Sequence, residues 1–349
     1  MRAFVVTKYK QPLREVDVDE PIVGDGDVLV QVEAAGLNQL DEKIRLGEFR
    51  QILPYRLPLI LGNDLAGTVI AVGANVHGFA RGDEVYGRPA KDRIGTFAER
   101  ITVAEADLAL KPASISMAEA GSLPLVALTA WQALVERGNV GPGQKVLIHA
   151  GAGGVGSIAI QLAKHLGATV ATTASSANAD FVRELGADIV IDYRSQDFER
   201  MLSGYDLVLD SLGGEVLEKS LRVLKPGGTV IGIAGPPDPD FAREAGVSPV
   251  LRLAVAALSR KIRAQAKILG VTYEFLFMRA SGDQLREITS LIDAGALRPI
   301  VGKVLPFEQT PQALQSLGRG GIRGKAVVTV SRPLAVGLHP ASIQEQSQS

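Results

Sequence analysis

The residues best suited to chemistry in this sequence lie in a glycine-rich turn, HAGAGGVG, that begins at His149. Three glycines of this turn, Gly151, Gly153 and Gly156, have the spacing G-x-G-x-x-G. The first glycine permits a tight turn, the second lets the backbone approach a pyrophosphate, and the third lets the following helix pack against the preceding strand. Amide N–H groups at the start of that helix then face the anion. The turn therefore predicts a binding site for a dinucleotide.

The segments around this turn alternate β-branched runs with amphipathic stretches, as repeated βα units do. Six runs are continuously apolar, which is typical of buried parallel strands. They are Val146 to Ala150, Thr169 to Ala174, Asp188 to Tyr193, Asp206 to Ser211, Thr229 to Ala234 and Val271 to Phe277. Such strands form a doubly wound sheet whose switch point binds a dinucleotide. This context favours cofactor binding over the alternative that the glycines only shape a turn.

The end of the second of these strands bears on the choice between NAD and NADP. An NAD site usually has a carboxylate about twenty residues after the glycine turn, whereas this chain has Thr173 to Ser176 there. A carboxylate would repel a 2′-phosphate by about 1–4 kcal/mol, so its absence favours NADP(H). The hydroxyls of Ser175 and Ser176 and the amide of Asn178 are candidate phosphate partners, and Tyr193 is a candidate cover for the adenosine. Alternatively, the serines only cap the next helix.

The composition excludes several classes of site. The 349 residues include no cysteine, four histidines, 37 Lys+Arg and 38 Asp+Glu, for a net charge of −1. Without cysteine there is no disulfide, thiolate catalysis or cysteine-ligated metal, and the histidines lack ligand spacing. A near-zero net charge gives no global field that would recruit nucleic acid or an anionic membrane. No signal-peptide or membrane-spanning run is present. We therefore expect a cytoplasmic protein with small-molecule partners and no metal.

The length of the chain and the change in its hydrophobic pattern, from short alternating strands to βα units, predict two domains. Residues 1–122 contain short alternating strands such as Asp27 to Gly36, which indicates a mostly antiparallel β domain. Residues 123–270 contain the βα units. Residues 271–331 are expected to return to the first domain with two helices and two strands. Residues 332–349 are polar and aperiodic and are expected to form a mobile tail.

Several motifs together resemble the zinc-free quinone oxidoreductase group of the medium-chain dehydrogenase/reductase superfamily, which includes zeta-crystallin-like proteins and alkenal/one reductases. The motifs are Gly36 to Gly47, Leu61 to Gly73, Arg81 to Gly87, Leu123 to Leu134, Ala150 to Lys164 and Gly324 to Val330. The match covers Met1 to about Val330. The resemblance implies an α/β fold, with a GroES-like β-rich catalytic domain built from both chain ends and a six-stranded Rossmann sheet inserted between them. It also implies a homodimer through the edge of the nucleotide-binding sheet, and the apolar helix Ser248 to Ile262 is a candidate cover or partner surface.

The resemblance further implies contacts with the cofactor beyond the glycine turn. With the turn and the adenosine end, the predicted cofactor-binding residues are Asn38, Thr129, Gly151, Gly153, Gly154, Val155, Gly156, Ser175, Ser176, Asn178, Tyr193, Leu212, Gly213, Ile233, Ala234, Phe275, Leu276, Phe277 and Lys325. The contacts implied by the resemblance have plain alternatives, such as a turn cap at Asn38, core positions for the phenylalanines and a solvated edge for Lys325.

The predicted catalytic residues are Asn38, Asp41, Lys43 and Tyr55. Zinc-dependent relatives place metal ligands where this chain has Asn38 and the pair at residues 63–64, Asn-Asp, so no Lewis acid is available to polarise an alcohol oxygen. A conjugated acceptor depends less on a Lewis acid than an alcohol does, because the negative charge left after hydride addition is delocalised over the acceptor. By resemblance, Asn38 lies near the nicotinamide, and Asp41 and Lys43 are expected to pair at the floor of the cleft.

Quinone oxidoreductases tend to have tyrosines after the GxN segment, where this chain has Ile44 and Phe49. Tyr55 or Tyr86 is the alternative proton donor, and solvent is another. The leading hypothesis is therefore NADPH-dependent, zinc-independent reduction of a quinone or an α,β-unsaturated carbonyl. Two other functions remain as hypotheses: a non-catalytic NADPH-binding protein, either a sensor or crystallin-like, and a zinc-free alcohol or aldehyde dehydrogenase.

Overall fold

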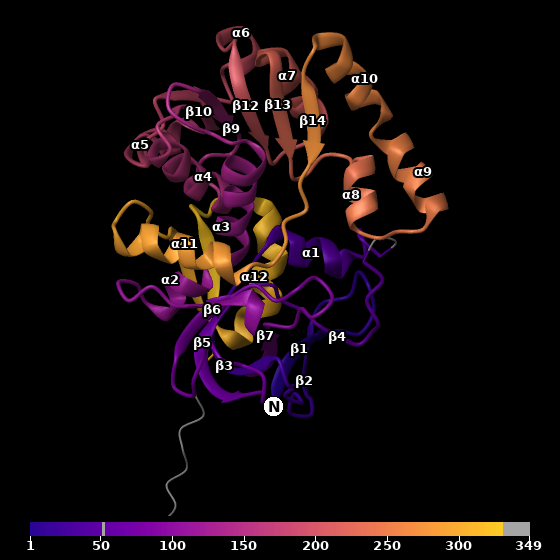
Figure 1. The fold of residues 1–349 in the computed structure, drawn as a ribbon, viewed down its shortest axis with the longest axis vertical. Coiled ribbons are helices and arrows are strands. Elements are labelled where there is room, and N and C mark those ends of the chain that lie inside the picture. The colour runs from indigo at the N-terminus through magenta and orange to yellow at the C-terminus, as the bar shows by residue number, and fades with distance from the viewer. Residues whose placement is uncertain (51–52, 331–349) are drawn as a thin grey trace, which may run out of the picture.

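The computed structural model describes residues 1–50 and 53–330, and the expected mobile tail at 332–349 lies outside these ranges. The chain folds into two halves stacked along the long axis of the molecule (Figure 1). One half contains a six-stranded sheet and the other contains a seven-stranded and a three-stranded sheet. None of the helices in the described ranges combines the length and the apolar composition that crossing a bilayer requires.

The six-stranded sheet is parallel throughout and has the strand order β11-β10-β9-β12-β13-β14. Its strands are β9 (Lys145–Ile148), β10 (Thr169–Ala174), β11 (Ile189–Asp192), β12 (Tyr205–Asp210), β13 (Leu224–Gly232) and β14 (Thr272–Phe275). The order reverses at β9, which is the switch point of a Rossmann sheet. All six expected strands are present. Because β14 pairs with β13, a domain boundary after residue 270 cuts this sheet, and the chain crosses to the other half only after Phe275.

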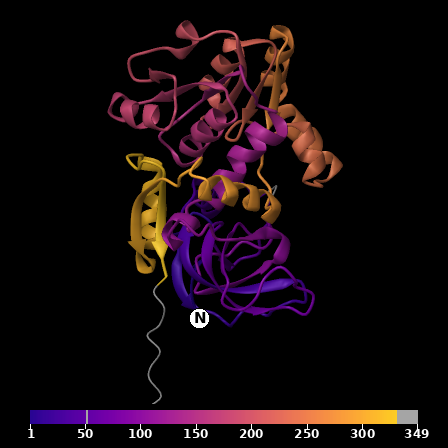
Figure 2. The same cartoon turned by 60° about the vertical axis from the view of Figure 1, so that its left-hand side comes forward.

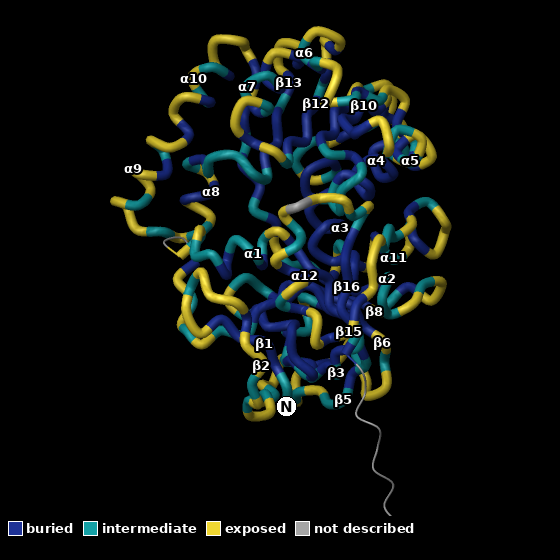
Figure 3. Tube along the Cα trace, turned by 180° about the vertical axis from the view of Figure 1, so that it is seen from behind, coloured by how far each residue is buried: buried dark blue, intermediate teal, exposed yellow. Residues whose placement is uncertain are grey.

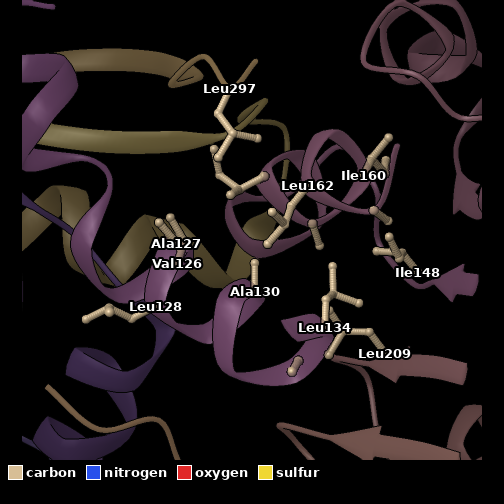
Figure 4. Packing of buried hydrophobic residues seen from close by; sticks show 14 of the residues in the cluster. Val126, Ala127, Leu128, Ala130, Leu134, Ile148, Ile160, Leu162, Leu209 and Leu297 are labelled. Carbon is tan, nitrogen blue, oxygen red and sulfur yellow. The ribbon is translucent and has the colours of Figure 1, made fainter. Parts of the chain in front are cut away.

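Helices cover both faces of the parallel sheet, as its continuously apolar strands require. They include α4 (Gly154–His165), α5 (Ala179–Glu184), α6 (Phe198–Met201), α7 (Gly214–Val223), α8 (Pro239–Glu244), α9 (Pro249–Leu258) and α10 (Arg260–Leu269). Ahead of the sheet, α3 (Pro124–Trp131) continues as one turn of π-helix, Gln132–Arg137. Apolar side chains of α3 pack against α4 and the strand ends (Figure 4). This packing joins the helix that links the two halves to the core of the sheet.

The other half is mostly antiparallel, as the alternation in its sequence predicts. Its larger sheet has the order β15-β16-β3-β5-β6-β8, with β7 also paired to β3. The strands are β3 (Asp27–Gly36), β5 (Leu65–Val72), β6 (Glu84–Gly87), β7 (Arg100–Ala104), β8 (Leu108–Leu110), β15 (Val301–Pro306) and β16 (Lys325–Thr329). The smaller sheet contains β1 (Arg2–Val6), β2 (Arg14–Asp17) and β4 (Leu59–Ile60). The helices are α1 (Gln39–Leu46), α2 (Met117–Gly121), α11 (Gly282–Asp293) and α12 (Thr310–Ser316). Each half has a buried cluster of its own, and a third cluster extends from the parallel sheet through α3 to β5, β6 and β8 of the β-rich half. Figure 3 shows buried residues in both halves.

The returning C-terminal segment ties the halves together. Strand β16 pairs antiparallel with β3, so both chain ends build one sheet. Just before β16, Gly324 forms a bridge with Gly153 of the glycine turn and donates its N–H to Ala152 O at 2.8 Å. Figure 2 shows this yellow segment beside the β-rich half, with its loops reaching the other half. The position of the glycine turn relative to the β-rich half therefore depends on the C-terminal segment.

Truncation of Leu147 should destabilise the chain strongly. This side chain lies in β9 at the centre of the parallel sheet and is fully buried. Leu147→Ala should lower the free energy of unfolding by about 2–5 kcal/mol, because it removes apolar contacts and leaves a cavity. The matched control is Leu110→Ala in β8, where the side chain is half exposed. Denaturant unfolding measures both variants, and an equal loss in the two would contradict the assignment of β9 to the sheet centre.

Candidate functional site

The glycine turn lies between β9 and α4 and has no room for a side chain at Gly151 or Gly156. A Cβ at Gly151 would lie 2.2 Å from Thr172 Oγ1, and a Cβ at Gly156 would lie 2.4 Å from the carbonyl oxygen of Ala150. Gly153 is the N-cap of α4 in an extended conformation. The first N–H groups of this twelve-residue helix have no partner within the helix and carry its positive dipole end. The turn is therefore built to bind an anionic group at close range.

Lys325 of the β-rich half and Val126 of α3 pack against this turn. A Cβ at Gly154 would lie 2.9 Å from Lys325 Cδ and 3.1 Å from Val126 Cγ1. Thr129 is buried in α3, and its hydroxyl donates to Leu125 O at 2.6 Å, a bond within the helix. The Thr129 hydroxyl, which was expected near the cofactor, therefore already donates its proton to a backbone carbonyl. A residue larger than glycine at 154 would push Lys325 away from its partners.

The predicted adenosine end contains a cation that the sequence did not single out. Arg323 donates from Nε to Asn178 Oδ1 at 2.8 Å and from Nη2 to Ala177 O at 2.9 Å. Its guanidinium also lies 5.3 Å from the centre of the Phe181 ring. Ser175 is buried and Ser176 exposed at the same turn. Arg323 is 145 residues from Asn178 in sequence, so no local pattern could have paired them.

Tyr193 lies at the end of the neighbouring strand, β11, with its side chain largely exposed. The guanidinium of Arg194 lies 5.8 Å from the centre of the Tyr193 ring. The register pairs Ala174 with Asp192, so the ends of β10 and β11 lie side by side. Tyr193 is therefore at the sheet edge where the prediction placed it, and its role over the adenosine remains a prediction.

Two further predicted cofactor segments lie beside each other at the ends of β12 and β13. The carboxylate of Asp210 accepts the N–H groups of Leu212 at 2.7 Å and Gly213 at 3.0 Å, and burial raises the pKa of this carboxyl. Gly213 has a φ of 71°, and a Cβ there would lie 2.9 Å from Ala234 O. Ile233 donates its N–H to Asp210 O at 2.8 Å. The structure thus brings together four residues that the sequence listed separately.

Aromatic side chains connect the end of β14 with α8 and the β-rich half. The rings of Phe241 and Phe275 are 5.1 Å apart, and those of Phe241 and Phe277 are 5.8 Å apart. Phe49, from the segment after α1, lies 6.2 Å from Phe277. Phe275 and Leu276 are buried, which matches the core alternative for these positions. Phe277 is only partly buried and meets a residue of the other half.

A buried polar network lies beneath Asn38, at the start of α1. The amide of Asn38 donates to Asp64 Oδ2 at 2.9 Å, and Lys325 Nζ lies 3.1 Å from the same oxygen. Lys325 also donates to Leu37 O at 2.8 Å and to Asn38 Oδ1. The other oxygen of Asp64 accepts the N–H of Leu125 at 2.7 Å. Burial of one carboxylate is therefore offset by an ammonium and two other donors.

Asp41 belongs to the same network but does not pair with Lys43. Its two carboxylate oxygens accept the Asn38 N–H at 2.9 Å and the Asn63 amide at 2.6 Å. Asp41 is fully buried, and burial raises the pKa of its carboxyl to about 7. The expected pairing with Lys43 is wrong, because residues two apart on a helix point to different faces. In place of a charged pair, α1 presents a carboxyl that is easily protonated.

Tyr55 and Tyr86 both donate their hydroxyl protons to backbone carbonyls. Tyr55 bonds Lys91 O at 2.6 Å, and burial raises the pKa of Tyr55 to about 12. Tyr86 bonds Leu285 O at 2.7 Å, and burial also raises its pKa. Close to Tyr55 lies Arg88, a fully buried cation, and burial lowers its pKa. Its Nε has no hydrogen-bond partner among the residues that the structure describes. Within the described residues, no three His, Asp or Glu side chains are placed to hold a metal.

Comparison with known proteins gives concordant results. The family models of the alcohol dehydrogenase GroES-like domain and of zinc-binding dehydrogenases match residues 24–113 and 185–328. The chain is 35% identical to the mitochondrial NAD(P)H oxidoreductase RTN4IP1 of Danio rerio, over 95% of this chain and 91% of that protein. It is also 35% identical to a chloroplastic NADPH-dependent alkenal/one oxidoreductase of Arabidopsis thaliana, over 94% and 79% of the two chains.

Among solved structures, the quinone oxidoreductase of Coxiella burnetii superposes with a TM-score of 0.83 at 32% identity, covering 95% of this chain and 99% of that one. The second family model is named for zinc binding. In this chain, which has no cysteine, Asn38 donates to Asp64, Asn63 donates to Asp41, and Asp64 accepts the Leu125 N–H. The fold is thus shared with the family, and the side chains of Asn38, Asn63 and Asp64 are already engaged in hydrogen bonds within the chain.

Ionisation of Asp41 should make the fold less stable as the pH rises from about 4 to about 7. The pKa of this carboxyl is about 7 in the folded chain and 3.8 without burial. In that window the folded state holds a proton that the unfolded state has lost, so the free energy of unfolding falls with increasing pH. Denaturant unfolding of wild type and Asp41→Asn across the window measures the effect. Asp283→Asn, at an exposed position, is the control, and equal slopes in wild type and Asp41→Asn would refute the assignment.

Proposed function

Because the chain belongs to the zinc-free quinone oxidoreductase group of the medium-chain dehydrogenase/reductase superfamily, we propose that it uses NADPH to reduce quinones or α,β-unsaturated carbonyls. The observation that carries this proposal is the glycine turn, with its two positions that exclude a Cβ, at the switch point of the parallel sheet. The names of the relatives, an alkenal/one oxidoreductase and a quinone oxidoreductase, support the acceptor class.

The residues present fit a phosphorylated dinucleotide. The N-terminus of α4 offers backbone donors to the pyrophosphate, and the ends of β12 and β13 offer the backbone of Leu212, Gly213, Ile233 and Ala234 along its path. Arg323 lies at the end of the site where a 2′-phosphate needs a cation, together with Ser175 and Ser176. These features support NADPH over NADH.

Bound NADPH supplies the hydride that the acceptor receives. The chain's own residues position and shield the reacting groups. Lys325 holds Asn38 by its side-chain oxygen, and Asp64 holds it by its amide, so Asn38 is fixed at the floor of the site. Phe277 and Phe49 form an apolar wall across the two halves. A conjugated acceptor fits this floor, because its oxygen gains delocalised charge and needs no Lewis acid.

The proton that completes the reduction need not come from Tyr55, because the Tyr55 hydroxyl already donates to Lys91 O. Asp41 is one hydrogen bond from Asn38 and titrates near neutral pH, with a pKa of about 7. Solvent is the other source of the proton. Catalytic roles for Asn38 and Asp41 belong to this proposal, which assigns no step to Lys43 or Tyr55. A homodimeric state, a cytoplasmic location and the absence of nucleic-acid partners belong to it as well.

The acceptor class is tested by following NADPH absorbance with purified chain and a panel of enones, quinones, simple aldehydes and secondary alcohols. We expect turnover with conjugated acceptors and none with isolated aldehydes, because only conjugation delocalises the negative charge without a metal. Oxidation of alcohols by NADP would instead favour a dehydrogenase. Binding of NADPH in calorimetry without turnover on any acceptor would favour the non-catalytic, sensor or crystallin-like alternative.

Arg323→Ala should weaken the binding of NADPH but not the binding of NADH. Loss of a charge-assisted contact with the 2′-phosphate costs about 1.5–3 kcal/mol, so the KM for NADPH should rise by about 10-fold to 100-fold while the KM for NADH stays constant. Arg286→Ala, another exposed arginine, is the control. Steady-state kinetics with both cofactors make the measurement. An equal rise in the KM for NADPH and the KM for NADH would show that Arg323 does not contact the 2′-phosphate.

A further inference from the structure

Helices α9 and α10 form an amphipathic rod at the edge of the nucleotide-binding half, with α10 beside β14 and α9 beside α8 (Figure 1). The helical hydrogen bonds continue from one to the other, because Ser259 donates its N–H to Val255 O at 3.3 Å and accepts the N–H of Arg263 at 3.0 Å. The buried residues of the rod are Val255, Ser259, Ile262 and Ala266. Their spacing of four, three and four places them on one helical face. Both helices therefore turn the same face to the body and the opposite face outward.

The outward face has an apolar stripe. Val250, Leu253 and Leu258 of α9 are 78%, 74% and 65% exposed, and Ile268 of α10 is 84% exposed. Ile268 follows Val250 by five turns at 3.6 residues per turn, so both lie on the same line along the rod. The exposed alanines 254 and 257 fill the space between them. Figure 3 shows α9 as mostly exposed. Large aliphatic side chains grouped in this way mark a docking surface.

The same rod is strongly basic. The segment 245–273 contains five cations and no Asp or Glu. Lys261 pairs with Glu218 of α7 at 2.5 Å, while Arg252 and Arg263 donate to backbone carbonyls. Arg260 and Lys267 make no side-chain hydrogen bond or ion pair with any residue in the described ranges, and both are exposed. Positive charge that the fold does not neutralise thus flanks the apolar stripe.

We propose that the α9–α10 face docks on an anionic lipid bilayer, with its apolar stripe at the boundary of headgroups and acyl chains and its cations against the lipid phosphates. A basic amphipathic rod about 30 Å long lies in the plane of such an interface. A second copy of the chain fits less well, because a two-fold interface on this face would bring the unpaired cations Arg260 and Lys267 close to the same cations of the other copy, with no carboxylate in the segment 245–273 to offset them. The expectation of no membrane partner rested on the net charge of −1, which averages over this local excess.

Docking would also give the proposed acceptors a source, since quinones and long-chain enals dissolve in bilayers. Helix α8 packs against α9, and its Phe241 contacts Phe277, which meets Phe49 of the other half. The rod and the apolar wall of the site are therefore parts of one packed unit. This consequence rests on the proposed function, whereas the docking itself does not.

The test is co-sedimentation of the full chain with phosphatidylcholine vesicles and with mixed phosphatidylcholine and phosphatidylserine vesicles. We expect binding to the mixed vesicles alone, weakened by salt. Arg260→Glu with Lys267→Glu should lower the partition coefficient at least about 25-fold, at about 5-fold per cation removed. Leu253→Asp should lower it at least about tenfold. The controls are Lys8→Glu with Lys303→Glu and Ile22→Asp, which change exposed residues of the other half.

Controls that bind like wild type, with the circular-dichroism spectrum of the folded wild type retained in every variant, would support the proposal. Absence of binding to mixed vesicles, or equal binding to both vesicle types, would overturn it. A dimer in light scattering that Leu253→Asp converts to a monomer, without vesicle binding by the wild type, would assign the face to a second copy. Because vesicle binding is measured without an acceptor, failure here leaves the reductase activity to its own test.

Discussion

The buried ion pair between Lys325 and Asp64, with Asn38 hydrogen-bonded to both, is the interaction on which the site depends. Burying these two charges carries a large desolvation cost, which their mutual attraction offsets only with the added hydrogen bonds from the chain. The three residues come from widely separated segments. The aliphatic stem of Lys325 also packs against Gly154 of the glycine turn. One side chain thus links the floor of the β-rich half to the anion-binding turn of the other half.

This network also engages the side chains that stand where metal-dependent relatives are expected to have zinc ligands. Asn63 and Asp64 stand at the positions that zinc ligands have in metal-dependent relatives, and their side chains bond Asp41 and the Leu125 N–H. Both are fully buried. Their donors and acceptors therefore maintain the shape of the floor. An acceptor whose charge is delocalised suits such a floor, because positioning and exclusion of water supply most of what the reaction needs.

The sequence predicted the sheet well, because continuous apolar strands and amphipathic helices are local patterns. The six strands, the glycine turn and the long antiparallel strand Asp27–Gly36 lie where the patterns indicate. The domain boundary after residue 270 separates Val271 to Phe277 from the sheet to which the strand pattern assigned it, and pairing with β13 places β14 in that sheet. The pairing of Asp41 with Lys43 is also wrong, because nearness in sequence was taken for nearness in space. Asp41 instead bonds Asn63, 22 residues away.

By itself, the sequence determined the α/β class, the place of the anion-binding turn and the lack of cysteine ligands, since each follows from residue type and short-range spacing. The tertiary structure alone decided which side chains meet. Lys325 reaches Asn38 across 287 residues, and Arg323 reaches Asn178 across 145. The outward direction of the α9 stripe was also decided there, because periodicity shows that a helix has an apolar face but not whether the fold covers it. Contacts of this kind depend on packing between segments, which short-range spacing does not encode.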